Sequence, residues 1–211
     1  KIKKEENVNS NLKLSISNKK IQVLLMFAGV FCCVAMSMPQ VHIVPLCIDN
    51  GFGLAVGTEI LSFMLFAAVT SRVLFGFLSD KIGPIQTLIL GSTLQAISLS
   101  MFLPFNSQLS LYIVAICFGL SQGGIVPIYA VIISKFLPEN EVAERVGLLI
   151  FATIVGMSLG GWLSGEIYDY TNSYQMAFLN GIFWNLINLL IMFYLFLKYK
   201  QSIKSVDKYE Y

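Results

Sequence analysis

The segment Ser71–Pro84 reads SRVLFGFLSDKIGP: an apolar run that contains an arginine and then turns polar at Ser79-Asp80-Lys81. An arginine at the centre of a membrane-spanning helix costs about 2.5–3.5 kcal/mol by insertion measurements, so such a residue usually serves a purpose. Arg72 is therefore the first candidate functional residue in this chain.

The composition indicates a membrane protein. Of the 211 residues, 56% are hydrophobic and only 12% are charged, and the mean hydropathy is +0.73. A soluble domain usually carries about 25% charged residues. The four cysteines lie within apolar runs without CxxC spacing, which favours small buried side chains over metal ligands or disulfides. We therefore predict an all-α integral membrane protein with no metal and no cofactor.

Six apolar runs each approach the ~20 residues that are needed to cross ~30 Å of hydrocarbon. We place these spans at Ile21–Cys47, Leu54–Ser79, Ile85–Phe102, Leu109–Phe136, Val142–Ile167 and Tyr174–Leu197. Residues 1–20 are predicted to be a cytoplasmic linker, residues 21–199 the six-helix bundle, and residues 200–211 a cytoplasmic tail.

The positive charges predict the orientation of the spans. Apart from Arg72, the lysines and arginines lie in residues 1–20, at Lys81, at Lys135 and Arg145, and in residues 198–208, whereas the three alternate loops hold none. By the positive-inside rule, the termini and the charged loops face the cytoplasm. This pattern predicts a multi-pass protein of a plasma or inner membrane with an even number of spans.

Two short motifs recur along the chain. Ile43-Val44-Pro45 returns as Ile125-Val126-Pro127, and Gly76-Phe77-Leu78-Ser79 returns as Gly161-Trp162-Leu163-Ser164, at separations of 82 and 85 residues. The order is the same in both copies, which suggests two three-helix units. Because three spans is an odd number, the second unit must be inverted, and we predict a 3+3 inverted repeat.

The residues Gly76–Gly83 match the loop motif G-x-L-[AS]-D-[RK]-x-G, and the chain resembles the major facilitator superfamily. The wider pattern at Val41–Gly51, Ser71–Gly83 and Met157–Tyr174 resembles the C-terminal half of its monocarboxylate-porter and oxalate:formate-antiporter branch. This resemblance implies helices seven to twelve of a twelve-helix transporter that works by alternating access. The N-terminal six-helix half would then be missing from this sequence.

Within the motif, the resemblance implies a conformational role, not ligand binding, for Gly76, Asp80, Lys81 and Gly83. The motif usually continues with two basic residues, but here Pro84 follows, and we expect Pro84 to begin the next helix.

The sequence departs from the branch in two ways that bear on the substrate. In many monocarboxylate porters an aspartate precedes the arginine by one helical turn, and Ala68 stands at that position here. Oxalate antiporters use a second cation on the fifth span, but the internal repeat aligns Arg72 with Met157. A single carboxylate is therefore favoured over a dianion, and the residue that carries protons stays unassigned.

Arg72 shares one predicted helix face with Leu65, and a guanidinium in a low-dielectric cavity prefers a bidentate carboxylate partner. The other members of this face are Leu61, Ala68, Gly76 and Ser79. We predict that Arg72 and Leu65 contact the substrate. Two alternatives stay open: the side chain extends to the cytoplasm, or it pairs with a residue of the missing half.

Three further residues are candidates for lining the substrate cavity. His42 lies about one turn ahead of Pro45, whose ring removes a backbone hydrogen bond and is expected to open the first span. His42 can exchange a proton near neutral pH, although a purely hydrogen-bonding role stays open. Gln122 and Tyr129 are predicted to share one face of the fourth span beside Gly123-Gly124, where an amide and an aromatic ring can orient a small ligand. Ordinary packing explains such a stripe as well.

These observations predict a secondary transporter of a small organic anion, a monocarboxylate, with protons as the coupling ion. A drug or amphiphile exporter is an alternative, and a non-transporting membrane scaffold or sensor is an alternative of another class. The chain has no HExxH, GxSxG, P-loop or carboxylate pair, so we do not expect an enzyme. The expected partners are the anion, protons, membrane lipid and the missing half, with no nucleic acid.

Overall fold

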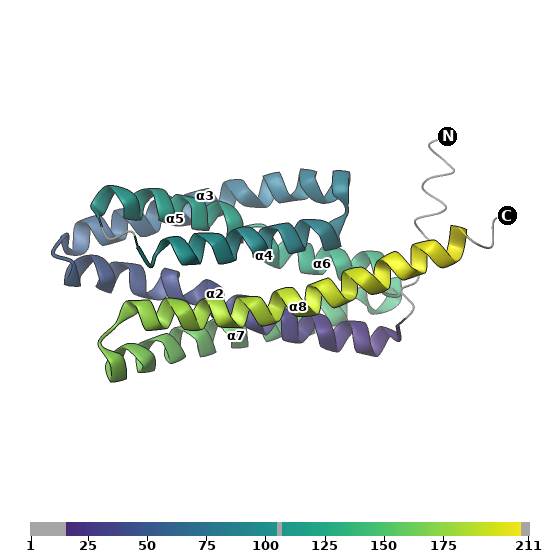
Figure 1. Cartoon of the computed structure of the whole chain (residues 1–211). Coiled ribbons are helices and arrows are strands. Elements are labelled where there is room, and N and C mark those ends of the chain that lie inside the picture. Colours follow the sequence, from purple (N-terminus) through teal and green to yellow (C-terminus); the bar gives the residue numbers. More distant parts are fainter. Residues whose placement is uncertain (1–15, 105–106, 208–211) are drawn as a thin grey trace.

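The computed structural model describes residues 16–104 and 107–207, which form a bundle of long helices that run side by side (Figure 1). The helices are α2 (Asn18–Asp49), α3 (Gly53–Ile82), α4 (Pro84–Met101), α5 (Gln108–Gln122), α6 (Ile125–Phe136), α7 (Val142–Thr171) and α8 (Tyr174–Asp207), with a short 3-10 turn at Glu139–Glu141 before α7. The start of α2 and the end of α8 lie at the same end of the bundle, as an even number of crossings requires.

Five stretches of the described chain are long and apolar enough to cross a membrane: α2, α3, α5 with α6, the 3-10 turn with α7, and most of α8. The remaining helix, α4, has 18 residues, or about 27 Å of helix. Its polar residues Thr87, Ser92, Gln95 and Ser98 lower its hydropathy, but all four are buried in the protein. The turns that flank α4 lie at opposite ends of the bundle, so α4 makes the sixth crossing (Figure 1).

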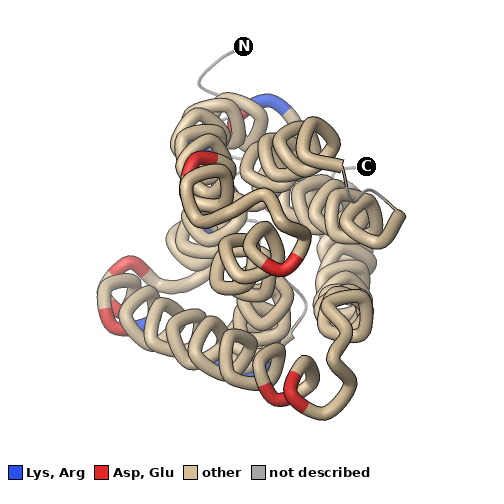
Figure 2. The backbone as a smooth tube through the Cα atoms, turned by 90° about the vertical axis from the view of Figure 1, so that its left-hand side faces the viewer, with Lys and Arg blue, Asp and Glu red and all other residues tan. Residues whose placement is uncertain are grey.

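The six predicted spans are thus confirmed as an all-helical membrane bundle with slightly longer helices. The predicted linker overlaps α2, which begins at Asn18, and the predicted tail overlaps α8, which reaches Asp207. Residues 1–15 of the linker and 208–211 of the tail lie outside the described residues. Seen along the bundle, charged residues (blue and red) lie mainly at turns and helix ends, with long stretches of other residues (tan) between them (Figure 2).

The prolines do not interrupt the helices as predicted. We expected Pro45 to open the first span, but α2 continues through both Pro39 and Pro45. The fourth span breaks instead, because α5 ends at Gln122 and α6 begins at Ile125 after Gly123-Gly124. At α4 the prediction is confirmed: Pro84 is the first helical residue, a position whose N–H has no partner within the helix, so the missing N–H of proline removes no helical hydrogen bond.

The turn between α3 and α4 explains one glycine of the loop motif. Gly83 ends α3 with a φ of 91°, a conformation that favours glycine, and its N–H donates to the carbonyl of Ser79 at 2.9 Å. Asp80 and Lys81 are exposed at this end of the bundle.

The contacts between helices follow the symmetry of an inverted repeat. The symmetry would exchange the first three spans, α2, α3 and α4, with the last three, α5–α6, α7 and α8. Under this exchange the α2–α7 contact corresponds to the α5–α3 contact, and the α2–α8 contact corresponds to the α5–α4 contact. All of these contacts are present, together with an α4–α8 contact that maps onto itself. This pattern agrees with the predicted 3+3 arrangement and places α2 and α5–α6 at the centre.

Two hydrophobic clusters fill the bundle, and polar contacts lie where they meet. One cluster joins the first half of α2 to α6 and the end of α8, and the other joins the second half of α2 to α5 and the start of α8. Buried polar groups connect helices between the clusters: Asn185 donates to the carbonyl of Ser92 at 2.8 Å, and Asn188 donates to the Ser92 hydroxyl at 2.9 Å. Such bonds join helices in lipid because water is absent as a competitor.

Glycines allow the helix backbones to approach closely at the two symmetry-related contacts. A Cβ added at Gly160 would lie 2.4 Å from the carbonyl oxygen of Val34 on α2. A Cβ added at Gly123 would lie 2.1 Å from the carbonyl oxygen of Ala68 on α3. Small residues at such contacts let helices associate in lipid, where no hydrophobic force acts between them.

We predict that Gly160→Ala destabilises the bundle, because the new methyl group would meet the backbone of α2, which cannot move aside. The expected loss is about 1–3 kcal/mol, typical of overpacking. The measurement is thermal unfolding of the purified protein in nanodiscs. Gly147→Ala is the control, since nothing lies within 4 Å of a Cβ at Gly147. Equal melting temperatures for the two variants would contradict the prediction.

Candidate functional site

Arg72 lies on an open face of α3. Its side chain is exposed, and so is Leu65, two helical turns earlier, while a Cβ at Gly76 would have no neighbour within 4 Å. In the residues that the structure describes, Arg72 forms no ion pair or hydrogen bond, and the ion pair that is present joins Glu141 to Arg145. The guanidinium is therefore free of charged partners within this part of the chain.

The face around Arg72 is not covered by the bundle itself. Only 33% of the most apolar stretch of α3 is buried, compared with 67% for α2. Because α2 lies at the centre and α3 at its side, the exposed face of α3 can border a ligand, lipid or another part of the protein.

The neighbour of Arg72, Ser71, holds the break between α5 and α6. Its Oγ donates to the carbonyl of Leu120 at 2.7 Å and accepts from the backbone N–H of Gly124 at 3.2 Å. One turn earlier, Ala68 packs directly on Gly123. Arg72 therefore belongs to the turns of α3 that contact the helix break, although its own side chain is exposed.

Gln122, the last residue of α5, is buried and pairs with Gln40 of α2. The Nε2 atom of Gln40 donates to Oε1 of Gln122 at 3.0 Å, and Gln40 is half-buried. The Nε2 atom of Gln122 is buried without a hydrogen-bond partner. The two glutamines are 82 residues apart, the separation of the first repeated motif, so they occupy equivalent positions near the axis that relates the two units.

His42 is a half-buried residue of α2 that faces α7. Its Nε2 is 3.3 Å from the carbonyl oxygen of Gly161, so this nitrogen carries the proton and donates. The imidazole ring also lies 6.5 Å, between centroids, from the ring of Tyr174. His42 thus fixes α7 against α2, and its part in proton exchange stays a prediction.

Tyr129 is fully buried on the side of α6 that faces α4 and α8. Its hydroxyl donates to Oδ1 of Asn188 at 2.7 Å, which joins it to the polar contacts around Ser92. Tyr129 and Gln122 were expected to share one face of a single helix, but the break at Gly123-Gly124 separates their helices. The structure places Gln122 at the helix break that Ser71, the neighbour of Arg72, contacts, and it places Tyr129 in the core.

Two further residues, Gln40 and Asp49, make polar contacts with partners that are distant in the chain, and neither contact was predicted. Gln40 carried a usable signal, because it precedes Pro45 by five residues just as Gln122 precedes Pro127. Asp49 carried none: its carboxylate accepts from the hydroxyls of Tyr168 at 2.9 Å and Tyr174 at 2.7 Å, which ties the α7–α8 turn to the end of α2.

We expect Ser71→Ala to destabilise the helix break, because it removes a donor from the Leu120 carbonyl and an acceptor from the Gly124 N–H. The expected loss of unfolding free energy is about 1–3 kcal/mol. Hydrogen exchange should also speed up at residues 119–126. The control is Ser134→Ala, whose hydroxyl bonds only to its own helix. Unchanged exchange at the break would refute the bridging role of Ser71.

Known proteins that match this chain are transporters. A sequence profile of the Major Facilitator Superfamily matches residues 23–209. Monocarboxylate transporter 13 of Rattus norvegicus is 29% identical over 143 residues, which cover 67% of this chain and 33% of that protein. The MFS-type transporter opdF of Penicillium oxalicum is 29% identical over 168 residues, which cover 75% of this chain and 40% of that protein.

An MFS-type transporter of Gibberella moniliformis is 27% identical over 146 residues, which cover 67% of this chain and 35% of that protein. This chain therefore spans 33–40% of the length of these curated relatives. With the helical bundle, its internal symmetry and a profile match over most of its residues, the chain belongs to the major facilitator superfamily.

Proposed function

We propose that this chain forms the C-terminal half of a secondary transporter that moves a small organic anion, a monocarboxylate, across a cell membrane by alternating access. The observation that carries the proposal is the guanidinium of Arg72, which lies on an exposed face of a membrane helix without a carboxylate partner among residues 16–104 and 107–207. Relatives named monocarboxylate transporter 13 support the substrate class.

A ligand carboxylate suits Arg72 for two reasons. An unpaired cation within hydrocarbon is unfavourable, so its face must border a water-filled cavity or a partner. The guanidinium also presents paired N–H donors that match the two oxygens of a carboxylate. A small anion bound between this bundle and the other half would satisfy the charge only while it is bound, as transport requires.

The charge of the site favours one carboxylate over two. The residue of α7 that the repeat aligns with Arg72 is Met157, and the cation on α7, Arg145, is already paired with Glu141 near the start of that helix. A dianion would leave one carboxylate without a counter-charge in the described part of this half.

Around the anion, the remaining candidates take supporting roles. Leu65 lines the exposed face of α3, while Gln40 and Gln122 form the amide pair at the centre of the bundle. His42 positions α7 beside this pair, and Tyr129 holds α6 in place from the core. Protons are the proposed coupling ion, and both termini are proposed to face the cytoplasm, as the positive-inside rule predicts.

We predict that Arg72→Gln abolishes uptake of a labelled monocarboxylate, because the substitution removes the charge that binds the carboxylate. Loss of a buried, charge-assisted pair typically corresponds to about 2–5 kcal/mol of binding free energy. The measurement is uptake into proteoliposomes that contain the complete transporter, with membrane insertion checked separately.

Lys135→Gln is the matched control, because it removes an exposed cation at a helix end. Uptake by Arg72→Gln at the rate of the unaltered protein would refute the role of Arg72. Normal export of lipophilic cations together with indifference to carboxylates would instead favour a drug exporter.

Gln122→Leu should separate stability from transport. The substitution removes a buried Nε2 that has no acceptor, which offsets the loss of the hydrogen bond from the half-buried Gln40, so we expect unfolding free energy to change by less than about 1 kcal/mol. Uptake should fall because the amide pair is broken. Gln95→Leu is the contrasting variant: both amide atoms of Gln95 contact Cys32, so it should lose about 1–2 kcal/mol. Thermal unfolding and uptake are measured on the same samples. Strong destabilisation by Gln122→Leu would show a structural role.

A further inference from the structure

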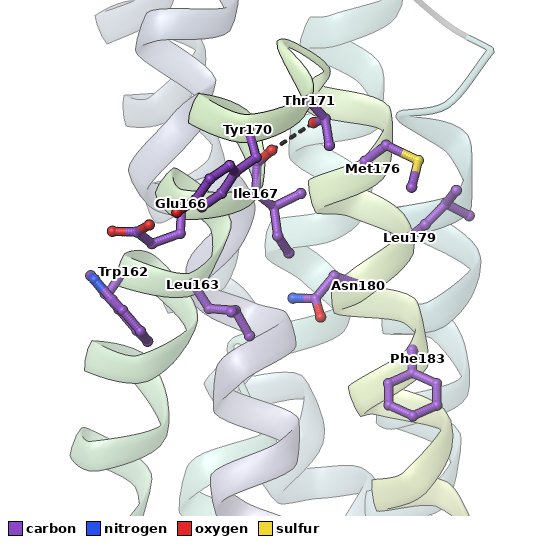
Figure 3. Close-up of a pocket in the computed structure, with 10 residues that line it drawn as sticks. All are labelled: Trp162, Leu163, Glu166, Ile167, Tyr170, Thr171, Met176, Leu179, Asn180 and Phe183. Atoms are coloured by element: carbon purple, nitrogen blue, oxygen red, sulfur yellow. Dashed lines mark hydrogen bonds between the residues drawn. The ribbon is translucent and has the colours of Figure 1, made fainter.

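A groove of about 660 Å³ runs between α7 and α8 near the turn that joins them (Figure 3). Most of its lining is apolar or aromatic, with Glu166, Thr171 and Asn180 as the polar exceptions. The full lining comprises Trp162, Leu163, Glu166, Ile167, Tyr170, Thr171, Met176, Leu179, Asn180 and Phe183. No part of the proposed anion site lies in this groove.

Glu166 is an acid without a partner in the groove. It is half-buried, and within the described ranges no cation or hydrogen-bond donor contacts its carboxylate. The 30 residues of α7 span about 45 Å, whereas the hydrocarbon core is ~30 Å thick. Glu166 lies five residues before Thr171, the end of α7, which puts it near the boundary between hydrocarbon and headgroups.

Two aromatic residues flank this carboxylate on the same face of α7. Trp162, Glu166 and Tyr170 are spaced by four residues, so their side chains follow one another along the helix. Trp162 is 63% exposed and Tyr170 is 85% exposed. An anionic group between two open aromatic faces is a suitable site for an ammonium ion, which is attracted by the charge and by the rings.

Across the groove, Asn180 of α8 offers an unused donor. Its Oδ1 accepts from the indole N–H of Trp184 at 3.1 Å, but its Nδ2 is buried without a partner. Figure 3 shows the amide nitrogen pointing from α8 toward α7, over the groove. A ligand in the groove can supply the missing acceptor as a phosphate or ester oxygen.

The rest of the groove is suited to a hydrocarbon chain. Leu163 and Phe183 line it toward the middle of the bundle, and Ile167 and Leu179 lie nearer the helix ends, at the level of Glu166 (Figure 3). The groove therefore combines an anion with aromatic rings, an N–H donor and apolar walls.

We propose that this groove binds a phospholipid whose headgroup carries an ammonium, as phosphatidylcholine and phosphatidylethanolamine do. The ammonium contacts Glu166 between Trp162 and Tyr170, a phosphate or ester oxygen accepts from Asn180, and one acyl chain lies along the apolar walls. The negative charge of Glu166 complements the ammonium, and the apolar walls complement the acyl chain.

The test is native mass spectrometry of the complete protein with phosphatidylcholine, phosphatidylethanolamine and phosphatidylglycerol of identical acyl chains. We expect the two ammonium lipids to bind roughly tenfold more tightly than phosphatidylglycerol, as expected for one charge contact near the membrane surface. Glu166→Gln should remove this preference, whereas Glu144→Gln, which alters an exposed acid near the other end of α7, should keep it.

A second variant tests the oxygen contact separately. Asn180→Leu should weaken all three lipids by a similar factor, because phosphate and ester oxygens are common to them, and should keep the order of preference. Equal binding of the three lipids to the unaltered protein, or an unchanged preference in Glu166→Gln, would overturn the proposal. Equally tight binding of free phosphocholine would also overturn it, since the acyl chain would then contribute nothing.

The lipid site is independent of the anion site. Arg72→Gln, which should abolish uptake, is expected to retain the full headgroup preference. A failure of the transport proposal would therefore leave the lipid proposal standing. In the same way, Glu166→Gln is expected to lose the headgroup preference and to retain uptake.

Discussion

The close approach of helix backbones at glycines is the constraint on which this bundle depends. Lipid provides no hydrophobic force that would press one apolar helix against another, so contact area must come from packing. At Gly160 and Gly123 a single Cβ would collide with the main chain of the neighbouring helix. These two contacts join α7 to α2 and α3 to α5–α6, and they fix where the exposed faces of α3 and α7 point. The positions of Arg72 and Glu166 follow from them.

The internal symmetry separates the shared scaffold from the features of the candidate site. Features that repeat, such as the pairing of outer helices with α2 and α5, build the scaffold. Two features break the repeat: Arg72 aligns with Met157, and the fourth span breaks at Gly123-Gly124 while α2 continues through Pro45. Gln40 and Gln122 are equivalent in sequence but not in surroundings, since the first is half-buried and the second is buried with one amide nitrogen unused.

The sequence predicted the architecture well because hydropathy, loop charge and repeated motifs are local signals. Six spans, the turn at Gly83-Pro84 and the inverted repeat could all be predicted in this way. The polar contacts between helices could not, because they depend on rotation of each helix about its axis. Tyr129 illustrates this limit: helical periodicity placed it beside Gln122, but the break in the span turns it toward Asn188. The predicted face of α3 is also divided by the structure: Arg72 and Gly76 are exposed, whereas Ala68 is buried against Gly123.

Two intramembrane charges without partners in the described chain occupy different depths, and depth determines what can neutralise them. Arg72 lies ten residues before the end of α3, about 15 Å along the helix, and is therefore well inside the hydrocarbon. At that depth the counter-charge can come from a solute in a cavity or from another helix, and the long side chain reaches the nearer membrane boundary only if it extends along α3. Glu166 lies about half as far from the end of α7, where headgroups are abundant. The same electrostatic requirement thus favours a transported anion at Arg72 and a resident lipid at Glu166.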